Sequence, residues 1–155
     1  MDLDPSTNEI ITRCCLAVLL GGLLGLEREW MRKTAGLRTH MMVALGSAAF
    51  TLVGLEVYSR AQHTGVDPTR LVEGIITGIG FLGAGAIIQN RGSVEGLTTA
   101  ASIWLVGAVG VASGGGHYVI ASMAVGLGLV ILFVIGRMER KLLLSSERAQ
   151  DATPE

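Results

Sequence analysis

The sequence predicts an all-α membrane protein, a polytopic bundle of about five short, glycine-rich transmembrane helices. Half of the 155 residues are apolar and only 16% are charged, whereas a typical soluble domain carries roughly 25% charged residues. The charges lie in short stretches between long apolar runs. Glycine accounts for 22 residues, about twice its usual share of roughly 7%. Many of these glycines lie inside the apolar runs, where small residues let two helix backbones approach closely.

The first two apolar runs cover residues 10–26 and 41–57. The first run starts among polar residues and no cleavage-like site follows it, so it is predicted to be a membrane span and not a signal peptide. It contains Arg13, whose long side chain is expected to snorkel outward. A charged loop, residues 27–33, follows the first run. A polar loop, residues 58–70, follows the second and contains the breakers Gly65 and Pro68.

The remaining runs cover residues 71–88, 97–113 and 118–136. Only Glu73 interrupts the third run, and residues 89–96 form a predicted loop after it. The fourth run is small and glycine-rich, so it either spans fully or is partly re-entrant. A turn at residues 114–116 leads into the fifth. We therefore expect a transmembrane domain over residues 1–136 and a charged cytoplasmic tail over residues 137–155.

The length and uniformity of these runs favour membrane spans. Each has about 17 to 19 residues, the low end of what crosses a hydrocarbon core of about 30 Å at 1.5 Å per residue. A soluble helix would carry a polar stripe, and none of these runs has one.

The distribution of Lys and Arg predicts the orientation. With five spans, nine of the twelve Lys and Arg residues fall on one side of the membrane. We therefore expect a multi-pass membrane protein with its N-terminus outside and its C-terminus in the cytoplasm.

Small residues recur at four-residue spacing, a pattern typical of close helix packing. A substrate path along the same grooves is the alternative interpretation. Gly-x-Gly-x-x-Gly at residues 78–83 is not taken as a dinucleotide fingerprint, because that motif needs a preceding strand. The predicted packing residues are Gly21, Gly25, Gly74, Gly78, Gly80, Gly83 and Gly85.

Charged residues near the spans are the first candidates for a functional site, because charges at membrane depth pair or mark a site. Glu27, Arg28 and Glu29 follow the first run. Glu27 and Arg28 could pair with Arg38, His40 or Glu95, or the charged group could simply anchor the helix. Glu27, Glu56 and Glu73 are weak candidates for holding Mg²⁺, which prefers oxygen ligands. Asn90, Glu95, Thr98 and Thr99 gather oxygen atoms before and at the start of the fourth run, where capping is the alternative role.

The sequence contains little that suggests other functions. Cys14 and Cys15 are adjacent and show no metal-ligand spacing. No nucleophile motif frames any serine, so no catalytic residues and no enzymatic activity are expected. A net charge of −1 and the lack of nucleic-acid motifs exclude a nucleic-acid-binding class.

Four motifs in order carry a family resemblance. They are GLERE at residues 25–29, AGLRTH at 35–40, GIGFLGAGAI at 78–87 and VEGLTTAASIW at 94–104. Together they resemble the MgtC/SapB family of bacterial inner-membrane proteins, over roughly residues 10 to 135. Matched by motif, the resemblance implies that the following residues matter: Glu27, Arg28, Glu29, Arg38, Thr39, His40, Asn90, Thr98 and Thr99.

The resemblance also implies a function. Members are often described as Mg²⁺ transporters, whereas the founding virulence protein is linked to growth in low Mg²⁺ and is thought to restrain the F-type ATP synthase. That member carries a soluble C-terminal domain, so this sequence is expected to resemble the short branch of the family. Glu73 departs from the Gln or Ala of the family pattern.

Three hypotheses follow from the sequence. The first is a regulator linked to Mg²⁺ homeostasis or stress, acting through contacts with another membrane protein such as an ATP synthase. The second is a transporter or channel for Mg²⁺ or another cation, and the third is an enzyme at the membrane interface. The glycine-lined faces also predict a homo-oligomer in the lipid bilayer.

Overall fold

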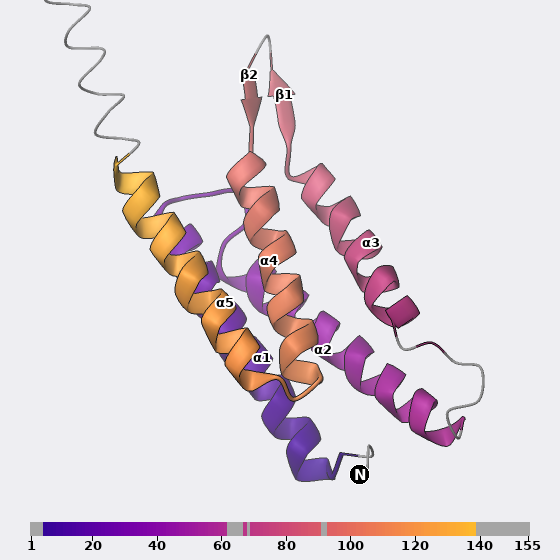
Figure 1. Cartoon of the computed structure of the whole chain (residues 1–155). Coiled ribbons are helices and arrows are strands. Elements are labelled where there is room, and N and C mark those ends of the chain that lie inside the picture. Colours follow the sequence, from indigo (N-terminus) through magenta and orange to yellow (C-terminus); the bar gives the residue numbers. More distant parts are fainter. Residues whose placement is uncertain (1–4, 62–66, 68, 91–92, 139–155) are drawn as a thin grey trace, which may run out of the picture.

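A computed structural model describes residues 5–61, 67, 69–90 and 93–138. It is an all-helical bundle with one short hairpin, which confirms the predicted fold class (Figure 1). The helices and strands, in chain order, are α1 (Thr7–Trp30), α2 (Leu37–Arg60), α3 (Thr69–Gly85), β1 (Ile88–Asn90), β2 (Ser93–Glu95), α4 (Leu97–Gly114), α5 (Tyr118–Val130) and the π-helical η1 (Ile131–Ile135).

Four of the described helices are long and apolar enough to cross a membrane. They are Thr7–Trp30, Leu37–Arg60, Leu97–Gly114 and Tyr118–Met138. The helix α3 has 17 residues and is shorter than all four, so α3 and not α4 is the marginal span. α1 and α2 each have 24 residues, because both continue beyond their apolar runs into charged residues.

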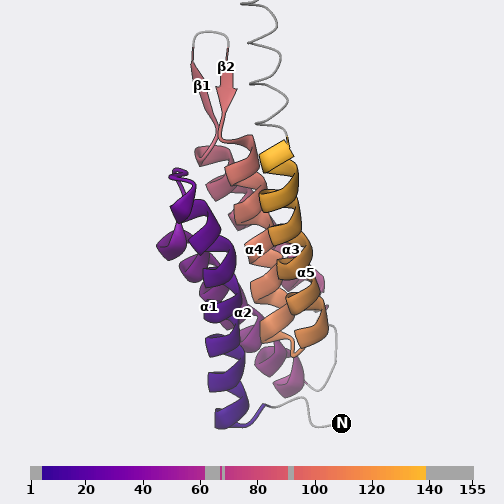
Figure 2. The same cartoon turned by 90° about the vertical axis from the view of Figure 1, so that its left-hand side faces the viewer.

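The helix α4 lies at the centre of the bundle (Figures 1 and 2). In α4, 56% of the candidate span is buried, against 28% in α1, 28% in α2 and 17% in α5. Its residues are small enough for neighbouring backbones to surround it, which is the close packing that glycine, alanine and serine allow in membranes. The small, glycine-rich residues made the fourth run an uncertain span in the sequence. In the structure, the same residues allow α4 to occupy the central position.

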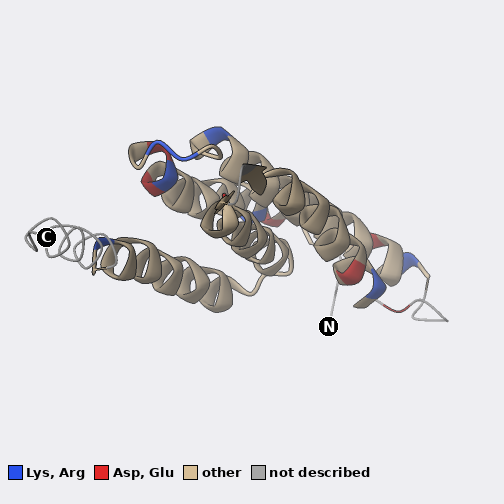
Figure 3. Ribbon diagram, turned by 90° about the horizontal axis from the view of Figure 1, so that it is seen from above, with Lys and Arg blue, Asp and Glu red and all other residues tan. Residues whose placement is uncertain are grey.

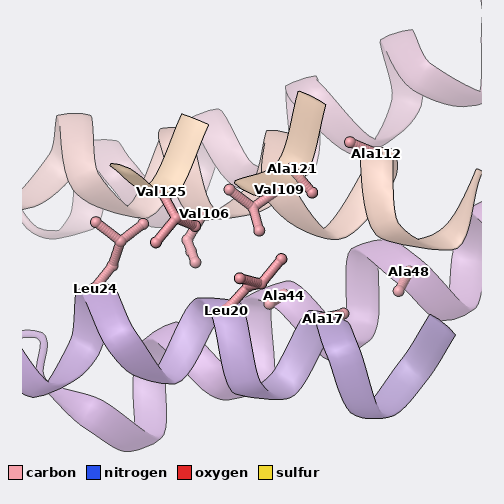
Figure 4. Close-up of a cluster of buried hydrophobic side chains, with 10 residues drawn as sticks. All are labelled: Ala17, Leu20, Leu24, Ala44, Ala48, Val106, Val109, Ala112, Ala121 and Val125. Carbon is pink, nitrogen blue, oxygen red and sulfur yellow. The ribbon is translucent and has the colours of Figure 1, made fainter. Parts of the chain in front are cut away.

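The main core lies where α1, α2, α4 and α5 meet (Figure 4). Leu20 and Leu24 of α1 point toward Val106 and Val125, while alanines fill the narrower places. A smaller cluster joins α3 to α4 through Ile75, Ile79 and Ile103. The middle of the bundle is therefore apolar, and the charged residues gather toward the ends of the helices (Figure 3).

The glycines predicted to pack helices divide into two groups. An added Cβ at Gly21 would lie 2.7 Å from Cβ of Ala44, and one at Gly25 would lie 2.8 Å from Cα of Leu37. Gly83 is in ordinary contact distance of Ala100. No described atom lies within 4 Å of an added Cβ at the other members, which are Gly74, Gly78, Gly80 and Gly85.

Three of the described segments reach the same end of the bundle. The α1–α2 turn, the β1–β2 hairpin and the end of α5 meet there (Figures 1 and 2). The predicted loop 89–96 is in part an antiparallel hairpin that pairs Ile88 with Glu95. Gly96, with φ +88°, follows this hairpin, and an added Cβ there would collide with the Ala86 carbonyl oxygen. A side chain at position 96 would therefore prevent the hairpin from closing between α3 and α4.

The C-terminal helix continues through Met138, two residues beyond the predicted domain boundary at residue 136. Residues 139–155 lie outside the described residues, so the charged tail stays a prediction.

Candidate functional site

Five polar side chains are buried together at the end of the bundle where α1 ends and α2 and α4 begin. Their exposed fractions lie between 0% and 4%. We call this group the buried polar cluster: Glu27, Arg28, His40, Thr99 and Ser102. All but Ser102 are among the residues that the sequence singled out.

Glu27 and Arg28 form an ion pair inside the cluster. Oε2 of Glu27 accepts a hydrogen bond from Nε of Arg28, whereas Oε1 of Glu27 is buried with no partner among the described residues. The sequence predicted a loop here, but α1 continues to Trp30 and carries both residues into the protein. Because a buried charge is costly without a partner, this pairing offsets part of the cost of burying the two side chains.

His40 connects α2 to α4 by hydrogen bonds. Its Nδ1 lies 2.8 Å from the Gly36 carbonyl oxygen, and its Nε2 lies 3.1 Å from Oγ of Ser102. Oγ of Ser102 in turn lies 2.8 Å from the Thr99 carbonyl oxygen. A carbonyl oxygen only accepts hydrogen bonds, so Nδ1 of His40 carries a proton.

This network has two arrangements that differ by one proton. With a neutral His40, Nε2 accepts a hydrogen bond from the Ser102 hydroxyl, and the Thr99 carbonyl oxygen loses its hydrogen bond from Ser102. With a protonated His40, Nε2 donates to Ser102, whose hydroxyl then donates to the Thr99 carbonyl. Both arrangements keep the hydrogen bond between His40 and Ser102.

Glu29 has a different role from its two neighbours. It is exposed, and its Oε2 accepts the backbone N–H of Leu37 at 3.0 Å, which caps the N-terminus of α2. An added Cβ at Gly36 would collide with this carboxylate. Glu29 and Gly36 together therefore define how the chain enters α2.

The other predicted cluster residues do not join the buried group. Arg38, Thr39, Glu95 and Thr98 are exposed, and Arg38 forms no ion pair with any described residue. Asn90 lies in β1 opposite Ser93, and its side chain is outside the described part. Adjacent helical residues point about 100° apart, so the helix buries Thr99 and exposes Thr98.

The sequence reasoning missed two polar features. Ser102 follows Thr99 by three residues, a helical spacing that places both on one face and could have revealed it. Arg13 does not simply snorkel, because its Nη1 donates to the Gly114 carbonyl oxygen at 3.0 Å. That contact satisfies a free carbonyl at the end of α4.

The structure does not bring the three weak metal candidates to one place. Glu27 lies at one end of the bundle, and Glu56 and Glu73 lie toward the other. Glu56 pairs with Arg60. No group of three or more His, Cys, Asp or Glu residues that could hold a metal ion occurs among the described residues. One free carboxylate oxygen on Glu27 does not make the six-oxygen site that Mg²⁺ requires, so a resident Mg²⁺ does not fit this cluster.

Comparison with known proteins finds relatives in several bacteria. The sequence profile of the MgtC family matches residues 14–141. The chain is 38% identical over 140 residues to YhiD of Escherichia coli K12, which is named as a candidate magnesium transporter; the match covers 88% of this chain and 65% of YhiD. It is 47% identical over 107 residues to Protein MgtC of Brucella abortus, covering 68% of this chain and 43% of that protein.

A protein of Synechocystis is 41% identical over 121 residues, covering 76% of this chain and half of that protein. The chain thus spans less than two thirds of these relatives. No solved structure matches it. The family match extends from α1 to the end of α5 and includes the whole buried polar cluster, so this chain belongs to the MgtC family.

Proposed function

We propose that this protein is a regulator in a bacterial inner membrane, linked to Mg²⁺ homeostasis or stress adaptation, and that it acts through contacts with another membrane protein. The F-type ATP synthase, which the family resemblance implies, is the first candidate partner. In this proposal the N-terminus lies outside and the buried polar cluster lies at the cytoplasmic end. The Lys and Arg bias supports that orientation.

The apolar layer next to the buried polar cluster supports a regulator over a carrier. A carrier should bury polar groups along a continuous path across the membrane. One helical turn beyond His40, Ala44 and Val106 are both fully buried, and an added Cβ at Gly21 would lie 2.7 Å and 3.2 Å from them. The next buried polar side chains, Ser47 and Ser113, lie on the far side of this layer.

The exposed residues beside the cluster offer the surface for a partner. Arg38, Thr39, Glu95 and Thr98 are all exposed and lie at the end of the bundle where the charged turn and the hairpin meet. Their side chains are free of the buried network, so a partner could bind them without opening the core.

The test combines a flux assay with partner capture. Purified protein in liposomes should admit Mg²⁺ no faster than empty liposomes. A tagged chain should retain its partner from native membranes, and Arg38→Glu should lose it while Arg60→Glu, at the other end of α2, should not. Saturable Mg²⁺ uptake by the purified protein would overturn the proposal, as would identical capture by both variants.

A Mg²⁺ or other cation carrier is the second candidate. The name of the Escherichia coli relative and the buried Glu27 Oε1 without a partner favour it. If the chain carries cations through this end, Glu27→Gln should reduce uptake at least tenfold. Equal uptake by wild type and Glu27→Gln would remove Glu27 from any such path.

A further inference from the structure

A cavity of about 640 Å³ separates α2 from α3. This volume lies within the range of roughly 300–1,000 Å³ that is typical of small-molecule sites. Its walls are almost entirely apolar. Gly46 of α2 and Gly74 and Gly78 of α3 leave it open, since no described atom lies within 4 Å of an added Cβ at any of the three.

The length of the groove matches one leaflet of a bilayer. On α3 it extends from Arg70 to Leu82, about 18 Å at 1.5 Å per residue. Half of a hydrocarbon core of about 30 Å is about 15 Å. A foreign transmembrane helix would need a groove of the full depth, whereas one acyl chain needs only a leaflet.

One charged side chain, Arg70, lines the groove at its end near the start of α3. Arg70 is exposed and forms no ion pair with a described residue. The nearby Asp67 is engaged by Thr69: hydrogen bonds from the Thr69 hydroxyl and N–H, and more weakly the charge of Arg70, lower the pKa of Asp67. A guanidinium in this position suits a phosphate, which it can bind with two parallel hydrogen bonds.

We propose that this groove binds one phospholipid, with an acyl chain between α2 and α3 and its phosphate on Arg70. The apolar walls and the length of the groove suit an acyl chain that fills one leaflet. The charge of Arg70 at one end suits the phosphate. This site is separate from the buried polar cluster and does not depend on the proposed regulatory function.

Native mass spectrometry of the detergent-purified chain, mixed with phosphatidylglycerol or phosphatidylethanolamine of equal chain length, tests the proposal. Gly78→Leu fills the groove without meeting another described atom within 4 Å at its Cβ. Gly126→Leu on α5 is the matched control, because its Cβ also has no neighbour. Gly46→Leu blocks the opposite wall and serves if Gly78→Leu does not fold.

Wild type and Gly126→Leu should each retain one tightly bound phospholipid. Gly78→Leu or Gly46→Leu should weaken retention roughly tenfold, which is about 1.4 kcal/mol. Arg70→Gln should weaken phosphatidylglycerol retention severalfold, whereas Arg60→Gln at the same end should not. Unchanged lipid retention by folded Gly78→Leu or Gly46→Leu would overturn the proposal. The proposal would also be overturned if these variants changed the oligomeric mass of the protein without changing the amount of bound lipid, because a second copy of the chain would then be the occupant of the groove.

Discussion

Glycines lie on both sides of α2. Those toward α1 and α4 meet neighbouring helices, whereas toward α3 Gly54 meets Leu71 and three other glycines have no close neighbour. Toward α1 and α4, which we call the closed seam, an added Cβ at Gly110 would lie 2.6 Å from Cβ of Ser47, and one at Gly114 would lie 2.9 Å from Cα of Ala48. Toward α3, which we call the open groove, Gly46, Gly74 and Gly78 have no neighbour within 4 Å among the described atoms. The same residue type therefore closes one interface and leaves space in the other.

The difference has a consequence for function. The closed seam holds His40 and Ser102 at hydrogen-bond distance, because the backbones of α1, α2 and α4 cannot shift without collision. The open groove leaves α3 tied to the bundle mainly by Ile75, Ile79 and Ile103. Paired substitutions, one on each side, can test whether the two regions differ energetically as they differ in geometry.

The largest difference is expected between two arginines. Arg28→Ala leaves the Glu27 carboxylate buried without a partner and should destabilise the fold by about 3–5 kcal/mol. Arg70→Ala, at the exposed end of the open groove, should change stability by less than about 0.5 kcal/mol. Thermal unfolding in detergent, followed by circular dichroism, measures both. The double variant Glu27→Gln/Arg28→Met should recover much of the loss, and equal melting temperatures for the two Ala variants would refute burial of the pair.

A pair of glycines provides the second test. Gly110→Ala places a methyl group against Ser47 and the Ala44 carbonyl oxygen, and should cost about 2–3 kcal/mol through overpacking. Gly78→Ala should be neutral or stabilise α3 by up to about 1 kcal/mol, because alanine favours helix and meets nothing. If both substitutions have the same effect on unfolding, the distinction between seam and groove is wrong.

Two hydroxyl side chains give a smaller contrast. Ser102→Ala removes the partner of His40 Nε2 and should destabilise the protein by about 1–2 kcal/mol. Thr77 on α3 is exposed and bonds only its own helix, at the Glu73 carbonyl oxygen, so Thr77→Ala should stay within about 0.5 kcal/mol. The ring nitrogen resonances of His40 in a ¹⁵N NMR spectrum should shift in Ser102→Ala and not in Thr77→Ala. Unshifted resonances in both would show that Ser102 does not bond His40.

The smallest effect is expected at the entrance to α2. Gly36→Ala forces the Glu29 carboxylate away from the Leu37 N–H and should cost about 1 kcal/mol, the usual value of a lost helix cap. An added Cβ at Gly85, at the end of α3, meets no described neighbour. Gly85→Ala should therefore destabilise the protein by less than Gly36→Ala does. In the background of Glu29→Ala, which already lacks the cap, Gly36→Ala should have little further effect. If Gly36→Ala destabilises the Glu29→Ala protein as much as it destabilises the wild type, Glu29 is not the reason why position 36 is a glycine.

The structure buries some of the residues that the sequence singled out and exposes others. Glu27, Arg28, His40 and Thr99 were singled out by their place beside membrane spans, and they do meet at one end of the bundle. Arg38 was expected as a partner for a buried carboxylate, but it is exposed. On α2, Arg38 is exposed, whereas His40, two residues later, is buried. The first turn of a helix has too few residues to show the apolar pattern from which this difference could be predicted.

By itself, the sequence determined the predominance of helices, their apolar character and the family. These follow from long apolar runs and from local motifs, which act within one segment of chain. Only the tertiary structure decided that α4 is central, that Gly21 and Gly110 are enclosed, and that Gly74 and Gly78 line an open groove. The spacing of small residues shows that a face can accept a backbone, but whether a neighbour fills that face depends on contacts between segments far apart in the chain.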